Sequence, residues 1–452
     1  MPSVSHPIGI LRFVASLVGL VTYACMIALY VCDKAAYLSI IRLVGVSPWD
    51  YPFIDSEFMY VMKNSWLHGV NVYQGVPDDV VPGNRMAYSP LWMRLPILSS
   101  DKSVTIPVGL ITDFLLILSL CILPPARRVR DAILLSLAVT STMIWFALER
   151  NNIDVWIYLC VVLGGLLLRR SYPIRVIAYG LFCLVGLLKY YPLMLIIYGV
   201  RERPGRALTI ALSSSLVTVI FGWAFWSEII QQMANVPKFS PGFDGFGAVD
   251  VSITLANIMV KSGSVTSLSF GQLELCLRVG LTLMILVGSF LLSRDKNLNL
   301  AMASMQEDSK IWLVIGCLLI GGCYLAGQNV GYRGVHLLFV LSGLLALGLV
   351  VPYPCVDRTI GRAAIVVVIL MWMEGIRGWS SIALNTWIAD EQNRYAVQRV
   401  VLLSREVLWV YLEIIMLGVL FTFLGQSTFW QWFANRQTAS RGTVGNISSR
   451  SS

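Results

Sequence analysis

The chain of 452 residues is 57% hydrophobic and only 13% charged, and its mean hydropathy is +0.72. Soluble domains carry about 25% charged residues, so this composition excludes an ordinary soluble protein and indicates an integral membrane protein. The net charge of +9 does not indicate nucleic-acid binding, because the basic residues stand in short connections between apolar runs.

The apolar runs predict an all-α, polytopic membrane protein. They are about 17–25 residues long, as a membrane-spanning helix requires, and they show no alternation with a period of two. We expect about twelve membrane segments in a GT-C-like bundle with structured outer-face loops. The expected helices are a run that ends before Arg169 and residues 8–31, 104–123, 131–148, 176–200, 207–226, 273–292, 311–326, 335–350, 363–373 and 407–424.

The connections predict which side of the membrane each loop occupies. The N-terminal run is too long for a signal peptide and is expected to be a retained first helix. The Arg-rich turns at 124–130, 169–175 and 201–206 are expected in the cytoplasm, together with both termini. Residues 1–434 then form a single transmembrane domain with outer loops at 32–103 and 227–271. The Ser/Gly/Arg-rich residues 435–452 form a disordered cytoplasmic tail.

The run at residues 176–200 has basic turns at both ends, so it is expected to reverse direction within the membrane. Pro192 cannot continue a helical hydrogen-bond ladder, which favours a break at residues 189–192. Each half would have only about 12–14 residues, too few for a full span. Because short, broken helices are tolerated only beside a cavity, Lys189 is predicted to face a cavity on the outer side.

Motifs for metals and nucleotides are missing from the sequence. The nine cysteines include no C-x-x-C pair, and the three histidines, His6, His68 and His336, have no zinc spacing. There is neither a G-x-x-x-x-G-K-[ST] motif nor a G-x-G-x-x-G motif followed by an acidic residue. We therefore predict no cofactor. A divalent metal would need carboxylates such as Asp55, Glu149 and Asp154, and nothing indicates one.

The predicted topology gathers polar residues at the outer face. Ionisable residues at helix ends inside a bundle are costly and are functional candidates by default. Carboxylates can accept a proton or bind hydroxyls, Lys and Arg can hold a phosphate, and tyrosines can lie against sugar rings. The candidates are Asp55, Tyr88, Glu149, Arg150, Asn152, Asp154, Lys189, Tyr190, Tyr191, Gln328, Asn329, Tyr332 and Arg333.

Several residues in these segments also have a structural interpretation. The structural interpretations are an N-cap for Asp55, an ion pair for Glu149 and Arg150, caps for Asn151, Asn152 and Asp154, and interfacial anchors for Lys189 and Arg333. Their occurrence together on one face favours a functional site over a set of unrelated structural roles.

Five short motifs follow one another in the chain. They are DSEFMY at 55–60, GVNVY at 69–73, YSPLWMRLPIL at 88–98, NIDVW at 152–156 and KYYP at 189–192. In this order they resemble the integral-membrane glycosyltransferases of the GT-C fold. They are similar in particular to glycosyltransferase family 87, the polyprenyl-phosphate-mannose-dependent mannosyltransferases. Two departures leave the sugar open: Glu149 and Arg150 replace the family's Gly-Gln, and Ser89 replaces the first residue of its Pro-Pro.

The resemblance implies an inverting transfer of mannose, or another pentose or hexose, from a polyprenyl-monophosphate donor to a lipid-linked or glycan acceptor. Asp55 matches the family's essential aspartate and would be the general base. Lys189, Arg333 and Arg150 would hold the donor phosphate. The sugar and the acceptor would contact Tyr88, Glu149, Asn152, Asp154, Tyr190, Tyr191, Tyr332 and Gln328. The expected place is a bacterial inner membrane, with the site on its outer face and membrane lipids as further partners.

Two other functions remain open from the sequence. A transporter or flippase of a lipid-linked sugar would gather polar groups at the membrane midplane, and no inverted repeat is visible. An O-antigen polymerase or ligase would usually carry its large outer loop late in the chain. Here the most motif-rich outer loop is the first one, which favours the glycosyltransferase.

Overall fold

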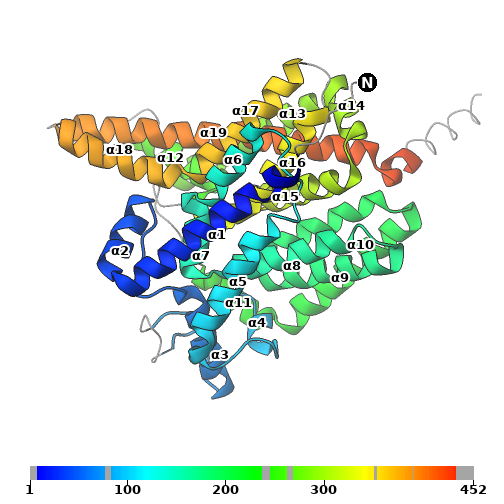
Figure 1. The fold of residues 1–452 in the computed structure, drawn as a ribbon. Coiled ribbons are helices and arrows are strands. Elements are labelled where there is room, and N and C mark those ends of the chain that lie inside the picture. Colours follow the sequence, from blue (N-terminus) through cyan, green and yellow to red (C-terminus); the bar gives the residue numbers. More distant parts are fainter. Residues whose placement is uncertain are drawn as a thin grey trace, which may run out of the picture.

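The computed structural model describes residues 8–76, 83–236, 245–261, 268–350, 354–388 and 390–433. Helices dominate it, and the described strands are two residues long each, β1 and β2, which pair antiparallel. The predicted class, an all-α polytopic membrane protein, is confirmed (Figure 1). The predicted tail at 435–452 lies outside the described residues.

The first half of the chain contains ten helices among its described residues. These are α1 (Ile8–Cys32), α2 (Lys34–Leu43), α3 (Ile54–Leu67), α4 (Leu91–Arg94), the 3-10 helix η1 (Lys102–Val104), α5 (Thr105–Ser119), α6 (Val129–Val139), α7 (Thr142–Arg150), α8 (Ile153–Leu167) and α9 (Tyr172–Lys189). The first outer loop predicted at 32–103 therefore contains short helices that build a structured cap.

The second half begins with a long 3-10 helix that directly follows α9. Its elements are η2 (Tyr191–Arg201), α10 (Pro204–Ala224), α11 (Trp226–Asn235), β1 (Gly245–Phe246), α12 (Ala248–Lys261), α13 (Phe270–Ser293), α14 (Lys296–Ser304), α15 (Glu307–Ala326), β2 (Asn329–Val330), η3 (Gly331–His336), α16 (Leu337–Val350), α17 (Pro354–Met371), α18 (Met373–Trp387) and α19 (Glu391–Gln426).

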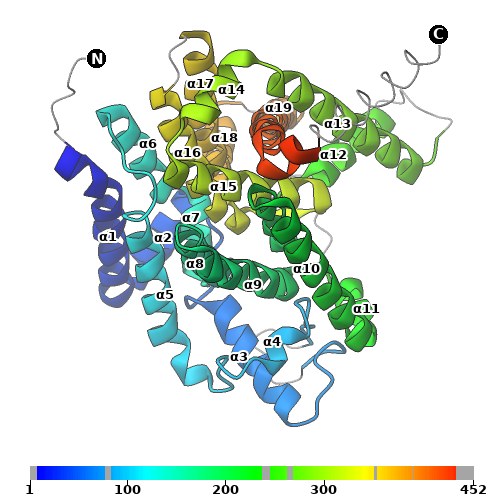
Figure 2. The ribbon, with the colours of Figure 1, turned by 90° about the vertical axis from the view of Figure 1, so that its right-hand side faces the viewer.

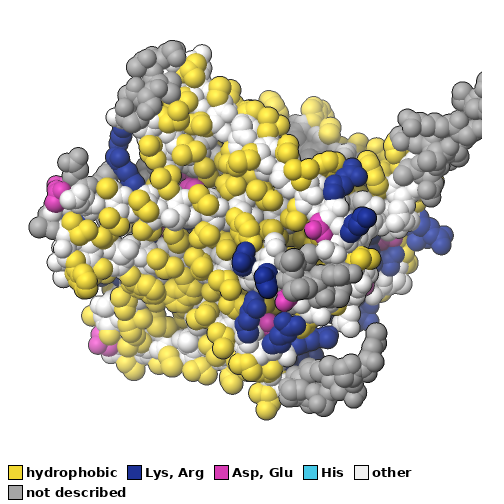
Figure 3. All heavy atoms as spheres, turned by 90° about the horizontal axis from the view of Figure 1, so that it is seen from above, with side chains coloured by type: hydrophobic (Ala, Val, Ile, Leu, Met, Phe, Trp, Pro, Cys, Tyr) yellow, Lys and Arg dark blue, Asp and Glu magenta, His cyan; other side chains and the backbone are white. Residues whose placement is uncertain are grey.

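Within the described ranges, 8 helices are long and apolar enough to cross a membrane, or up to 10 if each of two bent pairs is one span. The bent pairs are α6 with α7, at 42°, and α17 with α18, at 61°. With the shorter apolar helices α8 and η2 added, the described residues contain about the twelve apolar segments that the sequence predicts. A broad hydrophobic surface, with Lys and Arg gathered toward one end, agrees with a membrane-embedded bundle (Figure 3).

Several predicted helices differ from the structure. The runs predicted at 363–373 and 407–424 are parts of the longer helices α17 and α19, which have 18 and 36 residues. Two others differ in their course. The run at 131–148 is not one helix, because the chain bends at residues 140–141 between α6 and α7. The break near Pro192 is present, with Tyr190 at a φ of 62° between α9 and η2. However, α9 begins at Tyr172 and has 18 residues, so its length is sufficient to cross a membrane. The expectation of two equally short halves was therefore wrong.

Helices α15 and α16 form the centre of the bundle (Figure 2). All side chains of α15 from Ile311 to Tyr324 are buried. Glycine allows the two helices to approach closely: a Cβ on Gly316 would lie 2.7 Å from the backbone nitrogen of Val340, and one on Gly343 would lie 2.6 Å from the Cα of Leu313. Close backbone approach through small residues is the usual way to pack helices where lipid replaces water.

The Arg-rich turns meet at one end of the bundle. Arg169 pairs with Asp308 at 3.6 Å, and Arg201 pairs with Glu307 at 3.1 Å. Arg127 donates to Gln306 at 3.4 Å. Turns that the positive-inside rule assigns to one side therefore share one end, away from α3 and α4 (Figure 1). That this end faces the cytoplasm stays a prediction.

Candidate active site

Asp55 lies in the first turn of α3 and lines a large cavity. Phe53, at a φ of 66°, occupies the N-cap position, so Asp55 is not the N-cap that the sequence left open. The backbone N–H of Phe53 donates to the carbonyl of Glu149 at 2.6 Å, which fixes the start of α3 against the end of α7. The Asp55 side chain keeps 23% of its surface exposed.

A left-handed turn between α7 and α8 presents two asparagines. Asn151 has a φ of 42°, a conformation that Asn tolerates better than most residues. Its side chain accepts from Ser56 at 2.6 Å and donates to Asp113 at 2.8 Å, which ties α3 and α5 to this turn. Asn152 caps α8 by accepting from the N–H of Asp154 at 3.0 Å.

Asn152 also connects the two charged halves of the site. Its Nδ2 donates to Asp55 Oδ2 at 2.6 Å, and to the Tyr88 hydroxyl at 3.4 Å. Its Oδ1 accepts from Lys189 at 3.3 Å. The capping interpretation of Asn152 therefore holds together with its place in the site.

Asp154 is the buried centre of a charged cluster. Lys189 Nζ donates to Asp154 Oδ2 at 2.6 Å, and Arg333 Nε lies 3.9 Å from the same oxygen. The Tyr191 hydroxyl donates to Asp154 Oδ1 at 2.7 Å and lies 2.6 Å from His336 Nε2. These three partners offset part of the cost of burying the charge of the Asp154 carboxylate. In return, Asp154 holds the neighbouring cations in place.

The aromatic residues surround the lysine. Lys189 Nζ lies 5.3 Å from the ring centroid of Tyr88 and 5.4 Å from that of Tyr332. The Tyr190 hydroxyl donates to Gln232 at 2.6 Å, which links α9 to α11. The rings of Tyr88 and Tyr332 thus flank the ammonium group, and a cation over an aromatic ring is attracted to it.

The remaining candidates lie at the edges of the cluster. Arg150 lies 3.7 Å from Asp55 and 3.2 Å from Glu149, whose other oxygen accepts from the N–H of Trp49 at 3.2 Å. Glu149 is buried and is part of the ion pair that the sequence left open. Gln328 donates to Asp250 at 2.6 Å. Arg333 donates to Asn329.

The cavity that collects these groups has a volume of about 710 Å³. Ligand pockets of about 300–1,000 Å³ are typical for small molecules, so the cavity has room for one. The predicted residues that line it are Asp55, Tyr88, Arg150, Lys189, Tyr190, Gln328, Tyr332 and Arg333. Glu149, Asn152, Asp154 and Tyr191 do not line the cavity, because they lie beneath its wall and are buried.

Burial raises the pKa of Asp55 above its ordinary value, although Arg150, the hydrogen bond from Asn152 and Lys189 each act to lower it. The carboxyl thus keeps a proton more readily than a free aspartate, yet its cationic neighbours stabilise the charged form. A general base works best when its pKa lies near the operating pH. A raised pKa moves Asp55 in that direction.

Sequence reasoning missed several members of this network. His336 was dismissed for lack of zinc spacing, but it stacks near Tyr158 and contacts Tyr191. Ser56 and Gln232 were not considered, because a lone hydroxyl or amide in a polar loop carries no pattern. The position of His336 three residues after Arg333, at the start of an apolar helix, was the available signal.

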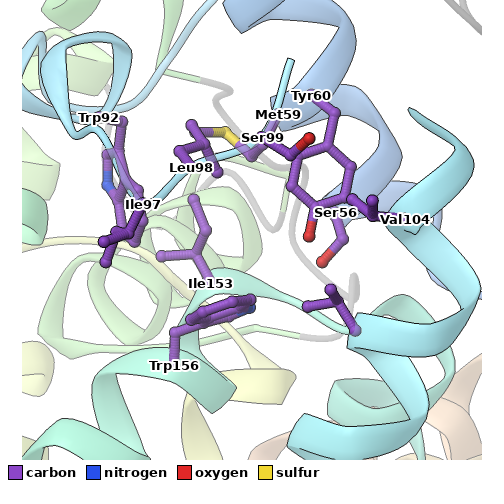
Figure 4. Close-up of a pocket in the computed structure, with 11 residues that line it drawn as sticks. Ser56, Met59, Tyr60, Trp92, Ile97, Leu98, Ser99, Val104, Ile153 and Trp156 are labelled. Carbon is purple, nitrogen blue, oxygen red and sulfur yellow. The ribbon is translucent and has the colours of Figure 1, made fainter. Parts of the chain in front are cut away.

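A second, smaller cavity lies on the other side of α3. Its volume is about 60 Å³, and its wall is largely apolar. Figure 4 shows Met59 and Tyr60 of α3 facing Trp92, Ile97, Leu98, Ile153 and Trp156 across it. Ser56, which lines this cavity, is the chain neighbour of Asp55. A polar cavity and an apolar cavity thus share the N-terminal turn of α3.

Among the residues that the structure describes, no three His, Cys, Asp or Glu side chains are grouped so that they could hold a metal ion. Asp55, Glu149 and Asp154 are each engaged with cations instead. That the chain works without a metal stays a prediction.

A comparison with known families matches residues 103–307 to glycosyltransferase family 87. The match contains Asn152, Asp154 and Lys189, whereas Asp55 and Arg333 lie outside it. No curated protein and no solved structure matches the chain. Its helical, polytopic fold agrees with the GT-C-like membrane enzymes. The predicted resemblance is therefore confirmed: over residues 103–307 the chain is similar to glycosyltransferase family 87, which indicates a membrane glycosyltransferase.

Proposed function

We propose that this chain transfers a sugar, mannose or another pentose or hexose, from a polyprenyl-monophosphate donor to a lipid-linked or glycan acceptor, with inversion. The observation that carries the proposal is the position of Asp55, a partly exposed carboxylate in the wall of a sugar-sized cavity with three cations nearby. The place we propose is a bacterial inner membrane, with both termini cytoplasmic and the site on the outer face.

The reaction needs one base and one stabiliser of negative charge. Asp55 takes the proton of the acceptor hydroxyl while the oxygen of that hydroxyl attacks the anomeric carbon of the donor sugar. The bond from that carbon to the phosphate oxygen breaks on the opposite face, and polyprenyl phosphate leaves. Its phosphate is already a good leaving group, so no general acid is required, but it gains one negative charge that fixed cations can stabilise.

Arg333 and Arg150 are better placed than Lys189 to contact that phosphate. Their side chains are 23% and 17% exposed and line the cavity, whereas that of Lys189 is 5% exposed and its ammonium is held by Asp154 at 2.6 Å. Guanidinium groups also match phosphate oxygens in a two-pronged geometry. We assign to Lys189 a supporting role, in which its positive charge lies behind the arginines. We assign contacts with the sugar to Tyr88, Tyr190, Tyr332 and Gln328.

The lipid part of the donor would enter from the hydrocarbon region. The apolar cavity beside Ser56 opens between α3, α5 and α8, and Ile97 and Trp156 form part of its rim. An isoprenoid chain has no polar group that needs a partner, so the apolar side chains at this rim can pack against it where it approaches the site.

The donor class is tested by supplying purified wild-type protein in lipid vesicles with a panel of radiolabelled polyprenyl-phosphate sugars and, separately, the matching nucleotide sugars. A crude glycan and glycolipid extract serves as acceptor. Transfer from a lipid donor alone is the expected result. Transfer from a nucleotide sugar in the absence of a lipid carrier would overturn the proposed donor.

The raised pKa of Asp55 predicts the acid side of the activity profile. A base must be deprotonated to act, so the rate should fall as the pH drops through this pKa, at a pH above the ordinary value of about 3.9. Arg150 lowers this pKa, so Arg150→Gln should move the acid limb of kcat to higher pH. Arg42→Gln, at an exposed position of α2, should leave the limb in place. A shift toward lower pH in Arg150→Gln would contradict the assignment.

A further inference from the structure

A third cavity, with both polar and apolar side chains in its wall and separate from the reaction cavity, lies between the end of α3 and α11. Its volume is about 270 Å³. Trp66, Asn71 and Tyr73 line it from the first outer loop, and Glu228 and Gln231 line it from α11. Neither the resemblance to known enzymes nor the proposed chemistry at Asp55 assigns a role to it.

The walls of this pocket are held in place by a network of contacts. Arg94 pairs with Glu228 through two nitrogens, at 2.6 and 3.0 Å, and its guanidinium lies 5.3 Å from the Trp66 ring centroid. The Tyr73 hydroxyl lies 3.4 Å from Glu228. Asn71 donates to Gln231 at 3.2 Å, which joins the loop to α11. Such a network fixes the side chains before a ligand arrives, which lowers the entropy cost of binding.

The chemistry of the lining selects a neutral ligand rich in hydroxyl groups. Glu228 is neutralised by Arg94, so the pocket offers no free charge for a phosphate or a cation. The two amides supply both donors and acceptors, and the indole supplies an apolar face. Amide groups beside an aromatic ring are suited to a sugar, which combines hydroxyl groups with an apolar ring face.

Helix α11 lies between this pocket and the reaction cavity. Gln231 lines the pocket, while the next residue, Gln232, lines the cavity and accepts from Tyr190. Asn235 of the same helix donates to the carbonyl of Tyr73 at 2.8 Å and to that of Met86 at 3.2 Å. Residues of α11 thus line both the pocket and the reaction cavity, so an extended acceptor could contact the two from either side of this helix.

We propose that this pocket binds a sugar unit of the acceptor distant from the reacting hydroxyl, so that the enzyme elongates a neutral oligosaccharide. The proposal rests on the proposed function, because the pocket gains this meaning only if Asp55 activates an acceptor hydroxyl. It predicts that longer acceptors bind more tightly than short ones, and that this difference in affinity depends on Asn71 and Gln231.

The experiment compares wild type, Asn71→Ala and Gln231→Ala, with Gln74→Ala as the matched control at an exposed position of the same loop. The acceptors are neutral oligosaccharides released from bacterial envelope glycans, separated by size and labelled with tritium at the reducing end. In transfer assays, each pocket variant should raise KM for long acceptors about 2- to 10-fold, the value of one hydrogen bond, with kcat unchanged. Short acceptors and the Gln74→Ala variant should behave as in wild type.

Binding is measured separately by equilibrium dialysis of the same labelled oligosaccharides, without donor. Size-dependent binding by wild type that weakens in Gln231→Ala supports the pocket even where no transfer occurs, and a failure of transfer alone then counts against the proposed donor. Equal changes for short and long acceptors in an active enzyme would overturn the pocket. So would an absence of size-dependent binding by wild type.

Discussion

Replacing Asp55 with Asn should lower kcat about 10²- to 10⁴-fold and leave KM for the donor nearly unchanged, the expected loss of one general base. Asn has the same shape and can still accept the hydrogen bond that Asn152 donates at 2.6 Å, so the start of α3 should remain in place. What it lacks is the ability to take a proton. Initial rates with a labelled lipid donor and saturating acceptor measure the effect.

The control for this variant is Asp50→Asn, which removes the same charge from an exposed position of the same loop. It should retain wild-type turnover. If Asp55→Asn and wild type transfer sugar at equal rates, the family resemblance stands but Asp55 is not the base. A matching thermal-unfolding midpoint for both variants separates loss of chemistry from loss of fold.

Much of the site could be predicted because topology alone brings helix ends together. Asp55, Asn152 and Lys189 are far apart in the chain. Asn152 and Lys189 each stand at an end of an apolar run, and Asp55 lies in the loop that is predicted on the same side. Alternating spans must return such ends to one face, so their meeting follows from the number of crossings. The basic turns at Arg127, Arg169 and Arg201 predict the number of crossings. In the structure these three arginines contact the same segment, residues 306–308, which agrees with that prediction.

The details that could not be predicted are those set by packing. Hydropathy alone does not show that α9 begins at Tyr172, because the residues at this position could belong either to the basic turn or to the helix. The bend between α6 and α7 occurs without a proline, and the Thr142 hydroxyl beside it donates to the carbonyl of Val44 at 2.6 Å. Such a contact across almost a hundred residues leaves no periodic trace.

The same limit applies to the pairing of charges. The sequence suggests that Lys189 holds the donor phosphate, but it cannot show that the Lys189 ammonium group is already paired with the Asp154 carboxylate. A residue that holds its neighbour in place and a residue that binds substrate look alike as letters. The structure separates the two roles by exposure, since Arg333 faces the cavity more openly than Lys189.

This distinction leads to a test of stability. Replacing Asp154 with Asn leaves the buried Lys189 and the adjacent Arg333 without their carboxylate. Removing one partner of a buried ion pair costs about 3–5 kcal/mol of unfolding free energy, because the other charge is left uncompensated. We therefore expect a clearly lower thermal-unfolding midpoint in detergent for Asp154→Asn. Asp308→Asn is the control, since its carboxylate is 63% exposed in its pair with Arg169 and such pairs contribute about 0–1 kcal/mol.

A double variant, Asp154→Leu with Lys189→Met, separates structure from function. Apolar residues of similar volume often replace a buried ion pair without loss of stability, so this variant should recover much of the unfolding midpoint. It should not recover sugar transfer, because Asp154 no longer holds Arg333 in place and Lys189 no longer donates to Asn152, the residue that donates to Asp55. Recovery of both stability and transfer would show that Lys189 serves only to neutralise Asp154, and the donor phosphate would then depend on Arg333 and Arg150 alone.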